Sequence, residues 1–115
     1  MKTSVKTTAE TKAIVMQSQT VLPVLNDKAT IQGKADFFKA LGDETRLQII
    51  AMLYVDDLCM CEIVDGLGVP TSTISHHLKL LERGNVIRSQ KEGRYTVYHL
   101  IKETILPLIE TRLLD

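Results

Sequence analysis

Two short amphipathic segments joined by residues 68–70 (Gly-Val-Pro) constrain the fold of this chain more than any other feature. In the second segment, Ile74, Leu78 and Leu81 follow the i, i+4, i+7 spacing that places apolar side chains on one helix face. Glycine and proline end helices, so the tripeptide predicts a tight connection between two helices, residues 59–67 and about 72–83.

Two β-rich runs follow these helices. Residues 86–90 and 94–100 flank a short turn, residues 91–93, that contains a glycine. This pattern predicts a β-hairpin. Two short helices followed by a hairpin form a winged helix-turn-helix. The expected fold class is therefore mainly α with a small β-hairpin wing (α+β).

The rest of the chain supplies further helices around this unit. With 115 residues, the chain has room for one domain, which we place at residues 31–115. Residues 1–30 are an N-terminal extension with a possible short helix ending near Pro23. A helix from residue 31 stops at Gly42, and Asp43 is a plausible N-cap for the next helix. Either Thr71 or Ser72 is expected to cap the helix after the turn.

The last helix, residues 101–113, contains Pro107. If Thr104 is the N-cap, this proline falls in the first turn, where its missing N–H does no harm. If the helix begins earlier, we expect a kink at Pro107.

Charge is distributed unevenly although the formal net charge is zero. Residues 51–66 contain four acidic side chains and no Lys or Arg, whereas residues 76–94 contain five basic side chains against two acidic ones. A basic end can face phosphates even in a neutral chain.

The start of the helix after the turn is suited to DNA. Short polar side chains there can hydrogen-bond base edges in a major groove, and basic residues near the hairpin tip can meet the backbone. The candidate DNA-binding residues are Thr71, Ser72, Thr73, Ser75, His76, Lys79, Lys91 and Arg94. The alternative is an ordinary helical domain whose Ser/Thr cluster only caps a helix. By periodicity His77 lies on the buried side and is expected to pack in the core.

The two cysteines, Cys59 and Cys61, are the sharpest chemical feature. Side chains at i and i+2 of a helix diverge by roughly 200°. These thiols therefore converge on one ion only if the helix start is unwound or strained. Thiolates select soft ions, and because they must lose protons, binding should strengthen as pH rises. The alternative is two partly buried thiols without a ligand.

Other classes of protein are disfavoured. The chain has no paired carboxylates in a cleft context, no Gly-rich phosphate loop and no convincing Cys-His pair, so we do not expect an enzyme. It has no run of 18 apolar residues and no secretory signal, so we expect a cytoplasmic location and no membrane partner.

The stretches "ALGDETRLQII" and "STISHHLKLL", with "EGRYTVYHL" after them, resemble the ArsR-SmtB family of metal-responsive repressors. The resemblance implies a homodimer built from the first and last helices, with two recognition helices on a palindromic operator. A domain of this size also has little core of its own. The expected interface residues are Phe37, Phe38, Ile105, Leu108 and Ile109.

The family's arsenic-responsive members carry a "CVCDLC"-like string at the start of this helix. Here two thiols match, and the third position is Val64. The resemblance therefore implies a repressor released when a thiophilic metal or metalloid, above all As(III), binds Cys59 and Cys61. The third ligand would be a water, a small cellular thiol or nothing, and a methylated arsenic species needs only two thiolates.

Several alternatives stay open. Relatives that sense cadmium or lead add cysteines from the N-terminal segment, but residues 1–58 hold no Cys or His. Relatives that sense zinc use a paired His and Glu on the last helix, which this chain lacks. A repressor that senses cadmium, lead, antimony, methylarsenite or oxidation is the alternative within this fold. A disulfide between i and i+2 is strained. A thiol-based metal carrier without DNA binding is an alternative of another class.

Overall fold

The computed structural model describes residues 1–114 and contains two compact units, residues 1–32 and the chain from Gly33 onward. In the first unit, α1 (Thr8–Val21) begins with a reciprocal capping box between Thr7 and Glu10. A short 3-10 turn, η1 (Pro23–Asn26), follows it, so the helix ends just before Pro23 as the sequence predicts. No side chain of α1 is buried within this unit.

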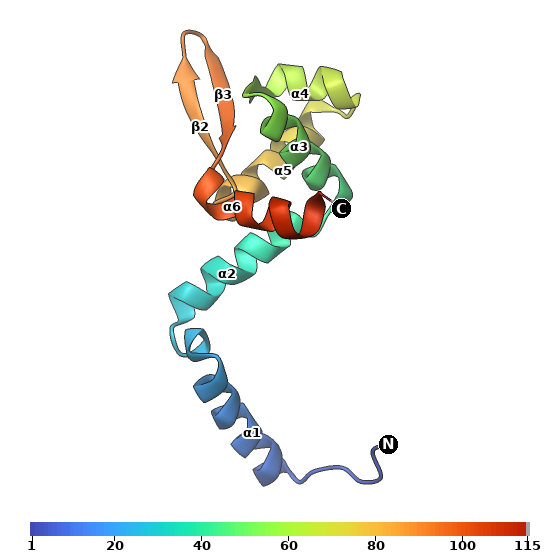
Figure 1. Ribbon diagram of the computed structural model, residues 1–115, viewed down its shortest axis with the longest axis vertical. Helices are drawn as coiled ribbons and strands as arrows, with labels where there is room; N and C mark the ends of the chain where they lie inside the picture. The colour runs from blue at the N-terminus through green and yellow to red at the C-terminus, as the bar shows by residue number, and fades with distance from the viewer. Residues whose placement is uncertain (115) are drawn as a thin grey trace. The chain divides into compact units, whose positions relative to one another are not determined.

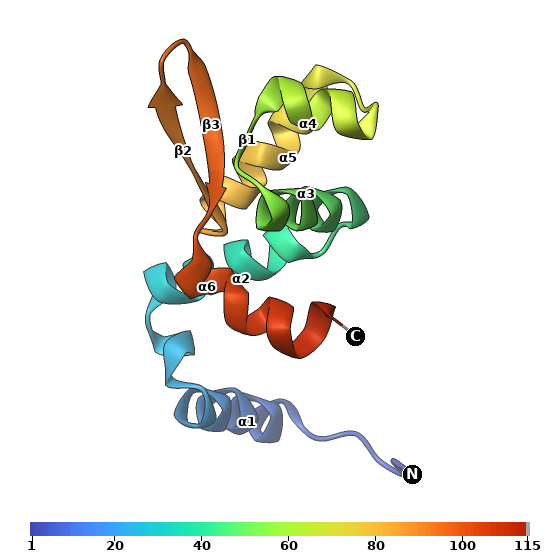
Figure 2. The same cartoon turned by 45° about the horizontal axis from the view of Figure 1, so that its top comes forward.

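The remaining elements form a mainly helical fold with a small antiparallel sheet, the predicted winged helix-turn-helix (Figures 1 and 2). In chain order they are α2 (Lys28–Leu41), α3 (Glu44–Val55), β1 (Leu58–Cys59), α4 (Met60–Leu67), α5 (Thr71–Arg83), β2 (Ile87–Glu92), β3 (Tyr95–Leu100), α6 (Lys102–Leu108) and a π-helical turn, η2 (Ile109–Leu113). Among residues 1–114, none of the helices combines the length and the hydrophobicity that a bilayer crossing requires.

The sheet has the strand order β1-β3-β2. Strands β2 and β3 form the predicted hairpin, in register from Ile87 opposite Leu100 to Glu92 opposite Tyr95. Gly93 adopts a left-handed φ of 64° at the tip, which a glycine accepts without strain. The hairpin stands out from the helices as a wing (Figure 1).

Strand β1 is an element that no sequence pattern predicts. It has two residues, with Leu58 opposite Tyr98 and Cys59 opposite Val97 on β3 (Figure 2). Two residues are too few to show a strand periodicity in the sequence. The pairing joins the backbone of Cys59 directly to the wing.

The core lies where α3, α4, α5 and α6 meet the base of the wing. Ile74, Leu78 and Leu81 of α5 are all fully buried, as their spacing predicts. The other fully buried large side chains come from α3, α4, β2 and the residue before it, and α6: Ile49, Ile50, Ile63, Val86, Ile87 and Ile105. This core fixes α5 with its opposite, polar face outward.

Helix ends agree with the sequence at two positions and differ at a third. Asp43 caps α3, and its carboxylate accepts a hydrogen bond of 3.0 Å from the Arg46 N–H. Gly68 ends α4 with a left-handed φ of 65°. The expected cap at Thr71 or Ser72 is wrong. Pro70 is the N-cap of α5, because its carbonyl already accepts the first helical hydrogen bond, 3.0 Å from the Ile74 N–H.

The C-terminal helix begins before Thr104. Its N-cap is Ile101, so Pro107 lies inside α6, and the alternative with Thr104 as N-cap is wrong. Proline lacks the N–H that would bond four residues back. The helix changes to π-type hydrogen bonding at Ile109, whose carbonyl accepts a bond of 3.1 Å from the Leu114 N–H. The hydrogen bonding thus changes two residues after the proline, and the kink itself stays a prediction.

The packing at Gly84 gives a testable prediction. A Cβ there would lie 2.7 Å from the Ala40 Cβ and 2.8 Å from the Asp36 carbonyl oxygen, and a backbone oxygen cannot move aside cheaply. We expect Gly84→Ala to lower the free energy of unfolding by about 1–3 kcal/mol, measured by urea denaturation. Gly33→Ala is the matched control, because no atom lies within 4 Å of a Cβ there. The steric account fails if both variants have the same effect.

Candidate nucleic-acid interface and thiol site

The polar face of α5 presents most of the predicted DNA-binding residues to solvent. Thr71, Ser72 and Thr73 in its first turn are exposed, as are His76 and Lys79 one and two turns later, while Ser75 is half-buried. The apolar face of the same helix is held in the core. The start of α5 is therefore open to a groove of DNA without rearrangement of the fold.

The wing places basic side chains at its tip. Lys91 and Arg94 lie on either side of Gly93, and both are exposed. The Arg94 guanidinium carbon lies 5.6 Å from the centre of the Tyr95 ring, which is cation–π distance. The ring limits the freedom of Arg94 and leaves its charge available to a phosphate.

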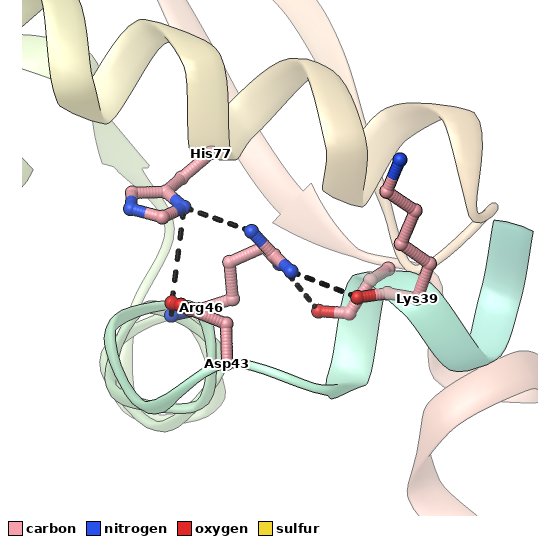
Figure 3. Close-up of polar contacts among 5 residues, drawn as sticks. Lys39, Asp43, Arg46 and His77 are labelled. Atoms are coloured by element: carbon pink, nitrogen blue, oxygen red, sulfur yellow. Dashed lines mark hydrogen bonds and ion pairs between the residues drawn. The ribbon is translucent and has the colours of Figure 1, made fainter.

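A buried arginine connects α5 to α2 and α3 (Figure 3). Arg46 is only 8% exposed. Its Nε donates to the carbonyl of Ala40 and its Nη2 to the carbonyl of Lys39, both at 2.9 Å, at the end of α2. Its Nη1 lies 3.1 Å from Nδ1 of His77 on α5. We call this set of contacts the Arg46 clasp.

His77 receives the clasp on the buried side of α5, where its side chain is 12% exposed. A guanidinium only donates, so Nδ1 of His77 accepts and its proton lies on Nε2. The carboxylate of Asp43 is 3.8 Å from the same Nδ1. The hydrogen bond from the Arg46 N–H, with help from the charge of the Arg46 guanidinium, lowers the pKa of Asp43.

The two cysteines converge although they are two residues apart. Cys59 is the N-cap of α4, with extended backbone (φ −84°, ψ 164°), and Cys61 lies in the first turn. Because Cys59 is outside the helix, the divergence of i and i+2 side chains on a helix does not apply to it, and both cysteines line one cavity. The condition set by the sequence, an unwound helix start, is met.

An open cavity of about 430 Å³ lies beside the thiols. Cys59 is 9% exposed and Cys61 is exposed, so a ligand reaches Cys61 first. Half of the lining comes from the start of α4 and half from the wing: Cys59, Cys61, Glu62, Glu92, Tyr95 and Val97. The sequence analysis did not expect the wing to take part in this site.

Glu62 shapes the chemistry of the thiols. Its carboxylate accepts a hydrogen bond of 3.0 Å from the Cys59 N–H, which lowers the pKa of Glu62. The hydrogen bond with Cys61, followed by burial, raises the pKa of Cys59. The bond between the Cys59 N–H and the Glu62 carboxylate thus holds the helix start. The Cys59 thiol stays protonated at neutral pH.

The donor set for an ion is limited to these thiols. Within residues 1–114, no three Cys, His, Asp or Glu side chains are arranged to hold a metal ion. The Glu62 carboxylate is already used in capping. The residues therefore fit an ion that accepts two thiolates and takes any further ligand from outside the chain.

The five expected interface residues lie in different surroundings. Phe38 is 65% exposed, and its ring meets the half-buried Phe37 edge-on with centroids 5.3 Å apart. Leu108 is half-buried. Ile105 and Ile109 are only 0% and 4% exposed in the protomer. These two side chains pack in the protomer's own core and expose little surface there, and the dimer interface stays a prediction.

Comparison with known proteins agrees with this arrangement. A family model described as "Bacterial regulatory protein, arsR family" matches residues 43–89. An uncharacterized HTH-type transcriptional regulator of Methanocaldococcus jannaschii is 38% identical over 77 residues, covering 66% of this chain and 86% of that protein.

Two further relatives are named for metal resistance. The cadmium resistance regulatory protein CadC of Listeria innocua is 40% identical over 75 residues, or 64% of this chain and 63% of that protein. The arsenical resistance operon repressor of Escherichia coli is 38% identical over 64 residues, or 55% of each chain. The chain therefore spans less than two thirds of either of these relatives.

Among solved structures, a homodimeric winged helix-turn-helix DNA-binding domain from Mycobacterium bovis matches with a TM-score of 0.66 and 27% identity, over 71% of this chain and 76% of that one. Together with the polar face of α5 and the wing, these matches define a transcriptional regulator of the winged helix-turn-helix class, not an enzyme. The chain belongs to the ArsR family of bacterial regulatory proteins.

The Arg46 clasp gives a second prediction. Arg46→Ala removes three hydrogen bonds and leaves the carbonyl of Ala40 without its donor, while the carbonyl of Lys39 keeps the Gly42 N–H at 3.2 Å. We expect the free energy of unfolding to fall by about 2–4 kcal/mol in urea denaturation. Lys39→Ala is the control, because only the backbone of Lys39 takes part. An effect of Arg46→Ala no larger than that of the control contradicts the clasp.

Proposed function

We propose that this protein is a homodimeric repressor that binds operator DNA through α5 and the wing and is released when a thiophilic ion, above all As(III), binds Cys59 and Cys61. The observation that carries the proposal is the convergence of the two thiols in a cavity shared by α4 and the wing. The polar start of α5 and the basic wing tip support the DNA-binding half. Relatives named for arsenical and cadmium resistance support the sensing half.

Arsenous acid suits a site with two thiols. Each thiol replaces one hydroxyl group on arsenic: an As–S bond forms, an As–O bond breaks, and the thiol proton leaves with the hydroxyl as water. Two such steps convert As(OH)₃ into a neutral (RS)₂As–OH group, in which the remaining hydroxyl fills the third position. This neutral product needs no third donor from the chain and no charge compensation in the cavity.

The position of Cys59 explains how the ligand would affect DNA binding. Cys59 pairs with Val97 of the wing and caps α4, which packs against α5. Bonds from both thiols to one atom restrict the helix start, so strain there reaches both DNA-contacting elements. A coupling free energy of about 1–3 kcal/mol is typical of allosteric proteins and sufficient for derepression. By linkage, operator DNA weakens ion binding by the same factor.

Cadmium is the second candidate, favoured by the 40% identity to a cadmium resistance regulator. The carboxylates of Glu62 and Glu92 line the cavity and favour a dication. Against it, residues 1–58 contain no Cys or His that a partner segment might add.

Fluorescence anisotropy tests the proposal. Apo protein is bound to a labelled duplex from the promoter of its own gene and titrated with arsenite. We expect release of the wild type and none of Cys59→Ser or Cys61→Ser, because one thiol cannot complete the site. If the wild type binds DNA and ignores arsenite, the inducer is a different one. If no variant binds DNA, the carrier alternative replaces the repressor.

The pH dependence of ligand affinity distinguishes the two ions. Because the pKa of Cys59 is raised, its thiol is protonated at neutral pH. A dication must release thiol protons to solvent, so cadmium affinity should rise by up to about tenfold per proton per pH unit between pH 6 and 8. Arsenous acid carries those protons away as water, so its affinity should stay nearly constant. Isothermal titration at several pH values measures both, and equal slopes would refute this assignment.

A further inference from the structure

His99 on β3 is held between two carboxylates from different parts of the fold. Its Nδ1 lies 3.0 Å from Oδ2 of Asp57, in the segment before β1. Its Nε2 lies 3.1 Å from Oε2 of Glu92, at the end of β2. The side chain of His99 is only 17% exposed, while the two carboxylates are about half exposed.

This geometry requires a particular protonation state. A neutral imidazole carries one N–H, so one of its nitrogens would present a lone pair to a carboxylate oxygen. The imidazolium ion carries an N–H on both nitrogens and donates to both carboxylates. The charged ring therefore satisfies both contacts at once, whereas a neutral ring can donate to only one of the two carboxylates.

The other charged groups around His99 come from β2 and α6. Arg88 is its cross-strand partner in the sheet. Lys102 and Glu103 line a cavity of about 290 Å³ together with Asp57, Arg88 and His99. Two cations and one further carboxylate thus line the same cavity as the His99 ring and its partner Asp57.

The two carboxylates lie at functionally separate places. Asp57 is two residues before Cys59, and Glu92 both lines the thiol cavity and neighbours the wing tip with Lys91 and Arg94. His99 therefore connects the lead-in to β1 with the strand that presents the basic wing residues. It does this independently of the backbone pairing of β1 with β3.

We propose that His99 is a positioning residue that, as an imidazolium ion, clamps the wing to the segment carrying Cys59 and makes operator binding sensitive to pH. This inference rests on the proposed function for its DNA-binding half only and needs no metal ion. Histidine changes charge between pH 5 and 8. The clamp is complete at the acidic end of this range and loses one of its two bonds as pH rises.

Anisotropy of the apo protein on the same duplex, from pH 6 to 8, tests the clamp. We expect the dissociation constant of the wild type to rise with pH by about three- to tenfold more than that of His99→Gln, whose neutral amide nitrogen holds one carboxylate at most. His99→Arg keeps a permanent charge and two donors, so it should bind tightly across the range. Parallel pH profiles of all three proteins would overturn the proposal.

Asp57→Asn serves as a matched variant from the other side of the contact. It removes one carboxylate and leaves the ring, and it should reduce the excess pH dependence of the wild type. Circular dichroism confirms that each variant is folded. Should His99→Gln not fold, the wild type still decides the question. The ¹⁵N resonances of the His99 ring must show both nitrogens protonated at pH 6. The amide resonances of Glu92 and Gly93 must shift with pH at the same midpoint as those of the ring. A neutral ring at pH 6, or a wing that does not follow, refutes the clamp.

Failure of the clamp and failure of the proposed function are distinguishable. Release by arsenite is measured at one fixed pH and depends on Cys59 and Cys61, whereas the clamp is read from apo protein. If arsenite releases the wild type but the pH profiles are parallel, only the clamp is wrong. If the profiles differ as expected and arsenite has no effect, the clamp stands and the inducer assignment fails.

Discussion

The position of α5 depends on a single buried guanidinium. Arg46 binds two carbonyls at the end of α2 and the imidazole of His77 on α5, so three helices share one side chain. The carbonyls at a helix C-terminus have no partners within the helix, and a planar group with several donors satisfies two of them at once. The remaining donor of Arg46 bonds to His77 on α5. The orientation of α5 is therefore fixed by α2 and α3 and not only by the short turn that precedes it.

The thiol site lies at the joint between this frame and the wing. Cys59 belongs to three local structures at once: it pairs in the sheet, it caps α4, and its thiol contacts Cys61. A ligand that bonds to both sulfurs therefore acts on a residue whose backbone is already shared by the two DNA-contacting elements. This placement makes a small local change sufficient, because it needs no long chain of intermediate contacts.

Much of the fold follows from short-range patterns. The spacing of Ile74, Leu78 and Leu81 predicts the buried face of α5, and Asp43 and Gly68 mark helix ends where the structure has them. The errors are equally local. A serine or threonine at a helix start is a strong capping signal. Pro70 nevertheless takes the N-cap position, because its own carbonyl accepts the first helical hydrogen bond from the Ile74 N–H. Periodicity marks Ile105 and Ile109 as apolar but does not show which surface covers them, and in the protomer both pack in the core.

The sequence by itself determined the order of the elements, the polar character of the exposed face of α5 and the soft-donor chemistry of Cys59 and Cys61, since each depends on residues within a few positions of one another. Only the tertiary structure decided that the thiols converge, that the wing lines their cavity, and that His99 lies between Asp57 and Glu92. The pairing of Cys59 with Val97 and the contact of Asp57 with His99 join residues about 40 positions apart, at or next to a two-residue strand that has no periodicity of its own. Such contacts arise from packing and register, which no local pattern of residues encodes.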